Sequence, residues 1–521
     1  MKNFYRLKKF TAVSLCTLGA NFIFSEAPKA EAVYEARSDT GTELFNYIEN
    51  RRREERANAL TEEQKKLLKD IETAKNNLPK PIQEGEPVPV AFEGSSLSFD
   101  AATGEFSAAG KVDIIQLEGY RFQSREAAGN INEQEIRVHG KAHMLQLVEG
   151  APRVTLDGYD TVYNYGTKTG TMGRARGKAG EYYISGKRFE FYPDHIVVYD
   201  ATQTKCGAKK PDYHVGAKRM EIWPEQIIRM YDVKFYVGER MVGSRGYFEK
   251  KIEEGDNPYF PRLGYDTDHG AYIEDTFEIP VINEHFKGVI HAHIGTKSHI
   301  RSNAEFHYDN REFSAKALYG YYYDTNKSWI KKEPGLDLLF RKRIPNLPMS
   351  YSIEYEIGDW SARGISSTHQ EFEIGLAHDP ITLFKKYNLF LSTSYKITKD
   401  DVKTSGVGDS TVKGMNYRGV VMREFDDRFA AYLGYEYTKN NSQNSVFDFG
   451  LDSYSNKFIA GASYRLTDRD RFVVGLKFDS ARRRLEDADY YWYRDLHCST
   501  AIIRWRQKRH KWEVRWQFTP W

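Results

Sequence analysis

The residues of this chain most able to do chemistry are three cysteines, Cys16, Cys206 and Cys498. The sequence opens with basic residues, continues with an apolar run and reaches an Ala-x-Ala site that ends at Ala32, which is the order of a secretory signal peptide. Cys16 lies inside the apolar run, so we expect it to be removed with residues 1–32. The mature chain keeps two thiols, which in an exported protein are more often bridged than free. The sequence alone does not show that these two are paired.

A metal site and a hydrolytic site are the other chemistries that the residue types allow. His291, His293 and His299 lie close together, but residues two apart in a strand only share a face. Neither a matched carboxylate nor a second histidine-bearing strand accompanies them, as a zinc site would require. No local motif marks a serine as the nucleophile of a Ser–His–acid hydrolase. We therefore predict no metal site, no cofactor and no covalent catalysis.

The composition limits the ways in which this chain can contact a membrane. Charged residues make up 29% of the sequence, and the mean hydropathy is -0.66. After the signal peptide no apolar run is long enough for a transmembrane helix, so any membrane-spanning part must be a β-barrel. The 36 tyrosines and 30 phenylalanines suit the aromatic girdles of such a barrel. A formal net charge of +3 on 521 residues predicts no nucleic acid or other polyanion as a partner.

Residues 33–89 are expected to form a charged helical spacer followed by a linker. The segment 42–75 is free of proline, and Thr61 with Gln64 forms the capping-box pattern of a helix N-terminus. Its apolar stripe is thin, which favours a spacer over the alternative of a docking helix for a periplasmic partner. The stretch NNLPKPIQEGEPVPV, rich in proline and polar residues, is typical of a linker.

Residues 90–255 are expected to form a β domain. Short β runs alternate with turns, and the motifs AAGKVDI, VHGKAHM and ARGKAGE recur from Ala108, Val138 and Ala175. Stacked strand pairs of this kind predict a jellyroll or a β-solenoid. Such a fold can open along one side to leave an apolar trough for an acyl chain, or it can keep a closed core, and periodicity does not separate the two.

Residues 256–521 show the alternation of an antiparallel transmembrane β-barrel. Apolar and polar residues alternate along many consecutive segments, and aromatic residues lie at the ends of these segments. A soluble sandwich would also alternate, but it does not account for so many long strands or for an aromatic C-terminal strand. The clearest apolar rows are Tyr351, Ile353, Tyr355 and Ile357; Phe472, Val474, Leu476 and Phe478; and Trp512, Val514, Trp516 and Phe518.

Seven turn candidates set the expected number of strands. The turns INEHFKG, YDNREF, IPNLP, DPITLFKKY, EFDDRF, LTDRDR and RQKRHK divide the region into about 14 strands. With an even number of strands and the β domain in the periplasm, both barrel ends lie on the periplasmic side. These tight turns then fall on the outer side and longer links such as TKDDVKTSGVGDST fall inside, which inverts the usual pattern of short periplasmic turns.

Three segments resemble a known family, the lipopolysaccharide-assembly outer membrane proteins (the LptD or organic-solvent-tolerance family). The stretch TKCGAKKPDYHVGAKRMEIWPEQIIRMYDVKFYVGERMVGS resembles the segment that closes the periplasmic jellyroll, an OstA/LptA-like domain, in that family. NPYFPRLGYDTDHGAYIEDTFEIPV is similar to the family's lead-in to the barrel, and RDLHCSTAIIRW to its cysteine-bearing penultimate strand. The resemblance covers residues 90–521, as a short form with two mature cysteines where the family carries four and with a much smaller barrel.

The resemblance implies a location, a function and several partners. It implies an outer membrane barrel with its N-terminal domain in the periplasm, which receives lipopolysaccharide from an LptA-like bridge protein and passes it into the outer leaflet through the barrel wall. It also implies insertion by the barrel-assembly machinery and an LptE-like lipoprotein plug, although the small barrel argues against a plug. In the family-like arrangement the last turns of the jellyroll lie next to the periplasmic rim, so we expect Cys206 to pair with Cys498.

The exit of a large amphiphile through the wall requires a weak seam, because parting two strands exposes backbone groups that lipid cannot satisfy. Two prolines near the ends of the first and last expected strands cannot donate ladder hydrogen bonds, although prolines also simply end strands. We expect the strands 270–281 and 512–521 to adjoin and to form a lateral gate. The gate residues expected from this reasoning are Pro280, Pro520, Thr276 and Gln517.

Two other functions stay open at this point. A diffusion porin would use the same barrel, but it has no reason to carry a large N-terminal domain. An outer membrane lipid hydrolase would show an activity that one side-chain change abolishes.

Overall fold

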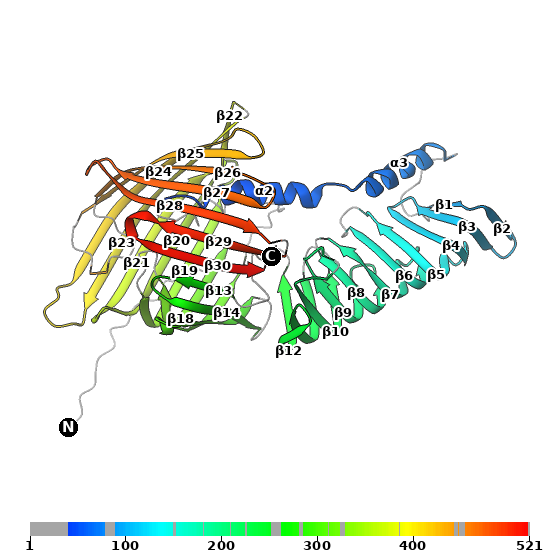
Figure 1. Ribbon diagram of the computed structural model, residues 1–521, viewed down its shortest axis with the longest axis horizontal. Coiled ribbons are helices and arrows are strands. Elements are labelled where there is room, and N and C mark those ends of the chain that lie inside the picture. Colours follow the sequence, from blue (N-terminus) through cyan, green and yellow to red (C-terminus); the bar gives the residue numbers. More distant parts are fainter. Residues whose placement is uncertain are drawn as a thin grey trace, which may run out of the picture.

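The computed structural model contains two β units and the helices α2 and α3 (Figure 1). It describes residues 40–78, 89–148, 153–180, 182–208, 210–223, 227–251, 262–280, 285–310, 312–323, 329–384, 386–441, 446–447, 454–496 and 498–518. The predicted signal peptide (1–32) and Pro520 lie outside the described residues. Within them, no helix is both long enough and apolar enough to cross a membrane.

The first β unit is an antiparallel sheet of 12 strands. From β3 onward each strand is hydrogen-bonded to the next one in the chain, while β1 and β2 both pair with β3. This order is a meander. A jellyroll needs Greek-key connections that cross over between strands, so the predicted jellyroll was wrong. The strands are β1 Val90–Glu93, β2 Ser96–Phe99, β3 Glu105–Gln116, β4 Tyr120–Asn130, β5 Glu135–Gln146, β6 Val154–Asn164, β7 Thr169–Ala179, β8 Tyr182–Phe191, β9 Ile196–Thr204, β10 Tyr213–Trp223, β11 Ile227–Val237 and β12 Arg240–Lys251.

Bulges interrupt the long strands of this sheet near their middles. The pairing of β3 with β4 shifts register between Ala109 and Val112, and β5 shifts at the matching place against β6. Gly110 and Gly140 lie at these two bulges with φ angles of 74° and 84°. Only glycine adopts such angles freely, and a bulge bends its strand. The first two Gly-Lys motifs of the sequence repeat therefore mark bends.

The bends fold the sheet onto itself. Phe92 is the cross-strand partner of Ile114, yet its ring centroid lies 4.5 Å from that of Phe106, at the other end of β3. Straight strand between Phe106 and Ile114 would span about 26 Å, so the two halves of β3 must face each other. The apolar side chains of both halves form one continuous core, in which residues such as Ile136 and Met144 are fully buried.

The second β unit is a closed antiparallel barrel of 16 strands. Its first strand, β13, pairs with its last strand, β30, which closes the cylinder. Two short pieces, β16 His299–Ile300 and β22 Ile381–Leu383, pair beside the main ladder. The barrel strands are β13 Arg262–Asp266, β14 Gly270–Pro280, β15 Phe286–Gly295, β17 Asn303–Asp309, β18 Phe313–Tyr323, β19 Trp329–Arg343, β20 Met349–Ala362, β21 Ile365–His378, β23 Tyr387–Val402, β24 Ser410–Glu424, β25 Phe429–Asn440, β26 Tyr454–Arg465, β27 Asp470–Asp479, β28 Arg484–Asp495, β29 Ser499–Arg506 and β30 Lys511–Phe518.

The prediction of about 14 strands missed two of them. The short strand β13 precedes the segment 270–281 that was taken as the first strand. Three strands, β27, β28 and β29, lie between LTDRDR and RQKRHK, where the turn spacing predicted two. Because adjacent strands run in opposite directions, one strand missed at the start moves every later turn to the other rim.

The inverted turn pattern was therefore also wrong. The rim formed by the start of β13 and the end of β30 is called the sheet-side rim below. Of the seven predicted turns, RQKRHK alone lies on the opposite rim, together with the link TKDDVKTSGVGDST, and the other six lie on the sheet-side rim. Two of those six are closed by side chains: Asn310 Oδ1 and Asp426 Oδ1 each accept hydrogen bonds from backbone N–H groups two and three residues later.

The barrel strands alternate as the sequence predicts. Phe472 and Phe478 of β27 are exposed, whereas Val473 between them is buried. On β30, Trp512 and Val514 are exposed on the outer face, and the alternate residues point to the lumen. The barrel therefore has an apolar outer surface and a polar interior.

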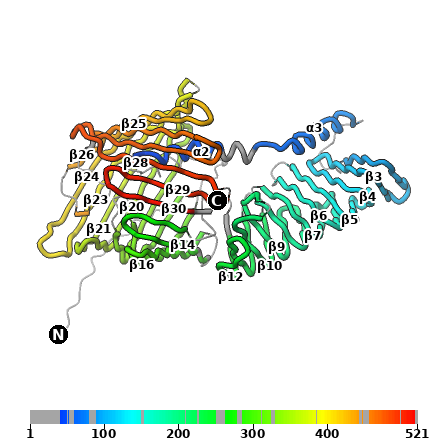
Figure 2. The backbone as a smooth tube through the Cα atoms, in the orientation of Figure 1, coloured from blue at the N-terminus to red at the C-terminus, as the bar shows by residue number. Residues whose placement is uncertain are grey.

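The segment predicted as a spacer packs against both β units. α3 (Glu62–Asn76) begins with the predicted capping box, in which Thr61 and Gln64 exchange side-chain to backbone hydrogen bonds. Its Leu67 and Ile71 pack on Leu145 of the folded sheet. α2 (Leu44–Asn58) lies inside the barrel, and Figure 2 shows α2 among the barrel strands and α3 beside the first strands of the sheet. The spacer interpretation was therefore wrong.

Candidate functional site

The barrel closes at a short seam between β13 and β30. Within the part of the chain that the structure describes, four residue pairs join these strands, from Leu263 opposite Trp516 to Asp266 opposite Glu513. Eight pairs join β30 to β29 on its other side. The seam thus has half as many residue pairs as the contact between β30 and β29. Parting β30 from β13 therefore breaks fewer backbone hydrogen bonds than parting β30 from β29.

The strand pair predicted for the lateral gate was wrong, because β13 lies between its two strands. In β14, Thr276 is opposite His291 of β15 and Pro280 is opposite Lys287. In β30, Gln517 is opposite Thr500 of β29. The gate itself stays a prediction, and its place moves to β13 and β30.

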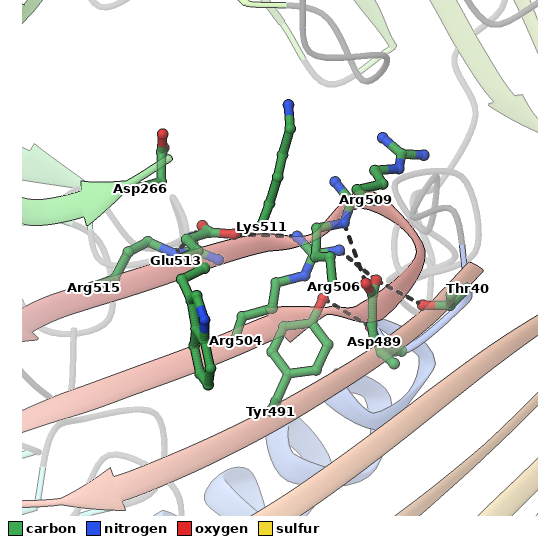
Figure 3. Close-up of polar contacts among 12 residues, drawn as sticks. Thr40, Asp266, Asp489, Tyr491, Arg504, Arg506, Arg509, Lys511, Glu513 and Arg515 are labelled. Atoms are coloured by element: carbon green, nitrogen blue, oxygen red, sulfur yellow. Dashed lines mark hydrogen bonds and ion pairs between the residues drawn. The ribbon is translucent and has the colours of Figure 1, made fainter. Parts of the chain in front are cut away.

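A charged cluster lines the lumen on the last three strands of the barrel (Figure 3). Asp489 of β28 is fully buried, and its carboxylate accepts Arg504 Nη2 at 2.5 Å and Arg506 Nε at 3.2 Å, both from β29. Arg504 also contacts Glu513 of β30 at 3.3 Å, and Glu513 pairs with Arg515 at 2.8 Å. Buried charges are costly unless they are paired. The cluster therefore holds β28, β29 and β30 in a fixed arrangement next to the seam.

The residues that precede α2 reach this cluster from inside the lumen. Thr40 Oγ1 donates to Asp489 Oδ2 at 3.3 Å, and the Thr40 carbonyl accepts from the Tyr432 hydroxyl at 2.6 Å. The fit is close at Gly475 of β27, where an added Cβ would lie 2.4 Å from Thr42 Cγ2. Contact of this kind requires glycine on the wall, so the turn before α2 and the wall are matched in shape.

Farther along α2, ion pairs attach the helix to the wall near the sheet-side rim. Glu49 pairs with Arg465 of β26 at 2.8 Å and with Arg471 of β27 at 3.3 Å. Arg52 pairs with Glu424, the last residue of β24, at 3.2 Å. Burial tends to raise the pKa of Glu49, but the guanidiniums of Arg471 and Arg465 outweigh burial and hold this pKa below its ordinary value.

A disulfide joins the two β units at the sheet-side rim. Cys206, which follows β9, is bonded to Cys498, which precedes β29, with a Cα–Cα distance of 5.0 Å. The predicted pairing is confirmed. Both cysteines are buried in the apolar core of the folded sheet, and Trp516 of β30 packs against the same core. Nearby, Arg245 of β12 lies 4.8 Å from the ring centroid of Phe277 of β14. The core of the sheet thus ends on a strand of the seam.

The three histidines considered as a metal cluster each contact different residues. Among the residues that the structure describes, no group of three metal-ligating side chains converges. His291 Nδ1 lies 3.0 Å from the hydroxyl of Thr276, and His299 belongs to the short piece β16. His293 is buried and makes different contacts, which the sequence did not suggest.

Those contacts have the geometry of a hydrolase triad. His293 Nδ1 lies 2.9 Å from Glu274 Oε1, and its Nε2 lies 2.7 Å from Ser298 Oγ. The sequence reasoning found no serine because Ser298 lies in a plain turn between β15 and β16, with no motif around it. The signal that could have found it is the placement of Glu274 and His293 on neighbouring strands. Only 6% of Ser298 is exposed, so the nucleophile has little access to a large substrate.

No family model and no curated protein matches this chain. Similar solved structures include a bacterial polysaccharide outer membrane secretin, with 11% identity over 50% of this chain and 98% of that chain and a TM-score of 0.31. A mutant porin of Rh. blastica has 9% identity over 50% of this chain and 96% of its own, with a TM-score of 0.28. OmpT of Vibrio cholerae has 10% identity over 50% and 94%, with a TM-score of 0.25. The fold of this chain is defined by its own strand pairing.

Proposed function

We propose that this chain is an outer membrane translocon that receives lipopolysaccharide from a periplasmic bridge protein and inserts it into the outer leaflet through the seam between β13 and β30. One observation carries the proposal. The apolar core of the folded sheet ends on Trp516 of the seam strand β30, and the bond between Cys206 and Cys498 fixes the sheet there. An acyl chain held by the sheet would reach the seam without crossing water, which avoids the cost of exposing apolar surface.

The barrel suits an amphiphile whose acyl chains pass along the outer face while its polar part passes through the lumen. Its outer face is apolar at the seam, with Trp512 and Val514 exposed, and this face accommodates acyl chains. Its lumen is lined with charged groups such as Arg504 and Glu513, which suit sugars and phosphates. Parting four residue pairs lets both parts of one molecule pass together.

The first edge of the folded sheet supports docking of an LptA-like bridge protein. β2 is an edge strand that, within the described residues, pairs with β3 alone. Its Leu97 and Phe99 are 55% and 53% exposed. An open edge with exposed apolar side chains is suited to the addition of a partner strand. The sheet of a bridge protein would thereby continue into this one.

A lipid hydrolase is the second candidate, and the contacts of Ser298, His293 and Glu274 favour it. In that case purified protein would be labelled by a serine-directed fluorophosphonate, and Ser298→Ala would abolish both the labelling and the release of acyl groups from glycolipid. We expect no labelling, because the serine is buried.

Depletion of the protein in its native host tests the translocon directly. Surface glycolipid, measured by its accessibility to an external modifying enzyme, should fall while glycolipid accumulates at the inner membrane. Expression of the wild-type chain or of Ser298→Ala should restore the surface level equally. Depletion that leaves surface glycolipid unchanged would refute the proposal, and rescue by the wild type alone would favour the hydrolase.

A further inference from the structure

The lumen wall carries a surface that the chain's own residues 40–52 occupy. Leu44, Phe45 and Ile48 of α2 are 3%, 2% and 2% exposed, and they pack on apolar wall residues. Burial of apolar side chains of this size stabilises the contact of the helix with the wall. Each strand from β23 to β29 contributes to the wall side of this cluster. The wall residues are Phe390, Val420, Met422, Ala430, Tyr432, Ile459, Val473, Tyr491 and Ile502.

Polar contacts fix both ends of the same segment. At its start Thr40 hydrogen bonds to Asp489, halfway along β28. Near the sheet-side rim Glu49 pairs with Arg465 and Arg471. The segment therefore runs from the middle of the lumen to the rim with contacts along its length, and it forms a built interface with the wall.

We propose that residues 40–52 are a plug supplied by the chain itself, which closes the lumen to water-soluble solutes and fills the place that a separate plug protein would need. A 16-strand barrel without a plug leaves an aqueous channel, and the apolar patch on its wall would then face water. The proposal goes beyond the translocon function, because closure of the lumen does not depend on which lipid is moved.

The plug also contacts the strands that lead to the seam. Thr40 binds Asp489, Asp489 binds Arg504, and Arg504 binds Glu513 of β30 (Figure 3). Movement of β30 relative to β28 and β29 would disturb this chain of contacts at its far end. The plug therefore contributes to the arrangement of the strands on the β30 side of the seam.

Charge reversal at Glu49 tests the plug. Glu49→Arg would place a cation against Arg52, Arg465 and Arg471, whereas the swap Glu49→Arg with Arg465→Glu and Arg471→Glu keeps opposite charges together. Glu62→Arg is the matched control, because Glu62 lies on α3 and its side chain is 90% exposed. The measurement is ion conductance of the purified full chain in planar bilayers.

We expect the wild type and Glu62→Arg to stay mostly closed, Glu49→Arg to spend at least about tenfold more time open, and the swap to return toward the wild type. Wild-type protein that conducts as steadily as a porin would overturn the proposal, as would a Glu49→Arg channel as closed as the wild type. A second measurement serves if that variant does not assemble. Cysteines at Phe45 and Tyr432, whose rings are in contact with centroids 5.1 Å apart, should be joined in native membranes by a bifunctional maleimide, which bridges side chains too far apart for a direct disulfide, and absence of this crosslink would also overturn the proposal.

Discussion

Gly475→Ala should open the lumen, although it adds a single methyl group. A Cβ at this position would lie 2.4 Å from Thr42 Cγ2 and 2.7 Å from Thr40 Oγ1. Both contacts are closer than real Cβ atoms tolerate, so the turn before α2 must move away from β27. In a strand that contacts nothing at this point, replacing glycine by alanine would instead be neutral or stabilising, by about 0.5–1 kcal/mol. The sign of the effect is therefore diagnostic.

The size of the effect follows from overpacking. Extra atoms in a close-packed interface cost about 1–3 kcal/mol, which corresponds to a shift of about 5- to 150-fold in the equilibrium between bound and released plug. Open time in planar bilayers should rise by that factor. Thr42→Ser removes the nearer clashing atom and should restore part of the closure when combined with Gly475→Ala.

Gly419→Ala provides the control for this prediction. An added Cβ there would meet Leu391 Cδ2 at 3.5 Å, an ordinary van der Waals distance. We expect Gly419→Ala to remain closed like the wild type. Equal open times for Gly475→Ala and Gly419→Ala would refute the reasoning that the turn before α2 fills this part of the lumen.

Three further predictions concern the contacts that hold the parts together. Cys206→Ser removes a link between residues 292 positions apart, so on the chain-entropy model it should lower the free energy of unfolding by up to about 5 kcal/mol; an unchanged denaturation midpoint would contradict this. Leu67→Ala should lose about 2–5 kcal/mol of packing at a fully buried site and speed hydrogen exchange in α3 at least about 20-fold, whereas Leu68→Ala, at a 42% exposed site, should not; equal exchange would argue against the docking of α3. The lowered pKa of Glu49, which faces Arg52, Arg465 and Arg471 and shares a cavity with Arg428, means that its stabilising charge is present above the ordinary glutamate pKa of about 4.3 and is lost as pH falls through the lowered value. Open time should therefore rise in acid for the wild type and not for Glu49→Gln, and the same acid response in both would contradict the role of this carboxylate.

The faces of the barrel strands were predictable because a period of two fixes which side chains share a face. Rows such as Phe472 to Phe478 therefore pointed outward as expected. The number of strands was not predictable in the same way. β13 spans five residues and includes Gly264, so it lacks a row of alternating residues long enough to detect. One undetected strand then reversed the inferred side of every turn.

The bend of the first sheet was partly visible in the sequence. Gly110 and Gly140 belong to a sequence repeat, but such a repeat also fits stacked hairpins without bends. The positive φ angles of these glycines, which distinguish a bent sheet from stacked hairpins, are a property of the structure. The pairing of Cys206 with Cys498 came from the family resemblance, because their separation along the chain says nothing about their distance in space.

The docking of α2 in the lumen could not be predicted from the sequence, because many of its contacts with the wall are ion pairs. Among its described side chains, α2 offers three buried apolar residues, so its apolar stripe is too thin to indicate a buried helix. Its partners are charges on strands more than 370 residues away, such as Glu424 opposite Arg52. Pairing of this kind depends on the closed barrel and has no local signal. The contact of Ser298 with His293 is local, and it was missed for a different reason, because no motif marks that serine.

If lipopolysaccharide leaves through the seam between β13 and β30, crosslinks at Val514 will separate this route from any other. Val514 is opposite Tyr265 across the seam and opposite Ile503 on the other side of β30. Tyr265→Cys with Val514→Cys closes the seam, whereas Ile503→Cys with Val514→Cys places the same crosslink within the intact wall. We expect the seam crosslink to stop delivery of glycolipid to the cell surface, and we expect the wall crosslink to leave delivery unchanged. Delivery at the normal rate through a fully crosslinked seam would contradict exit by this route.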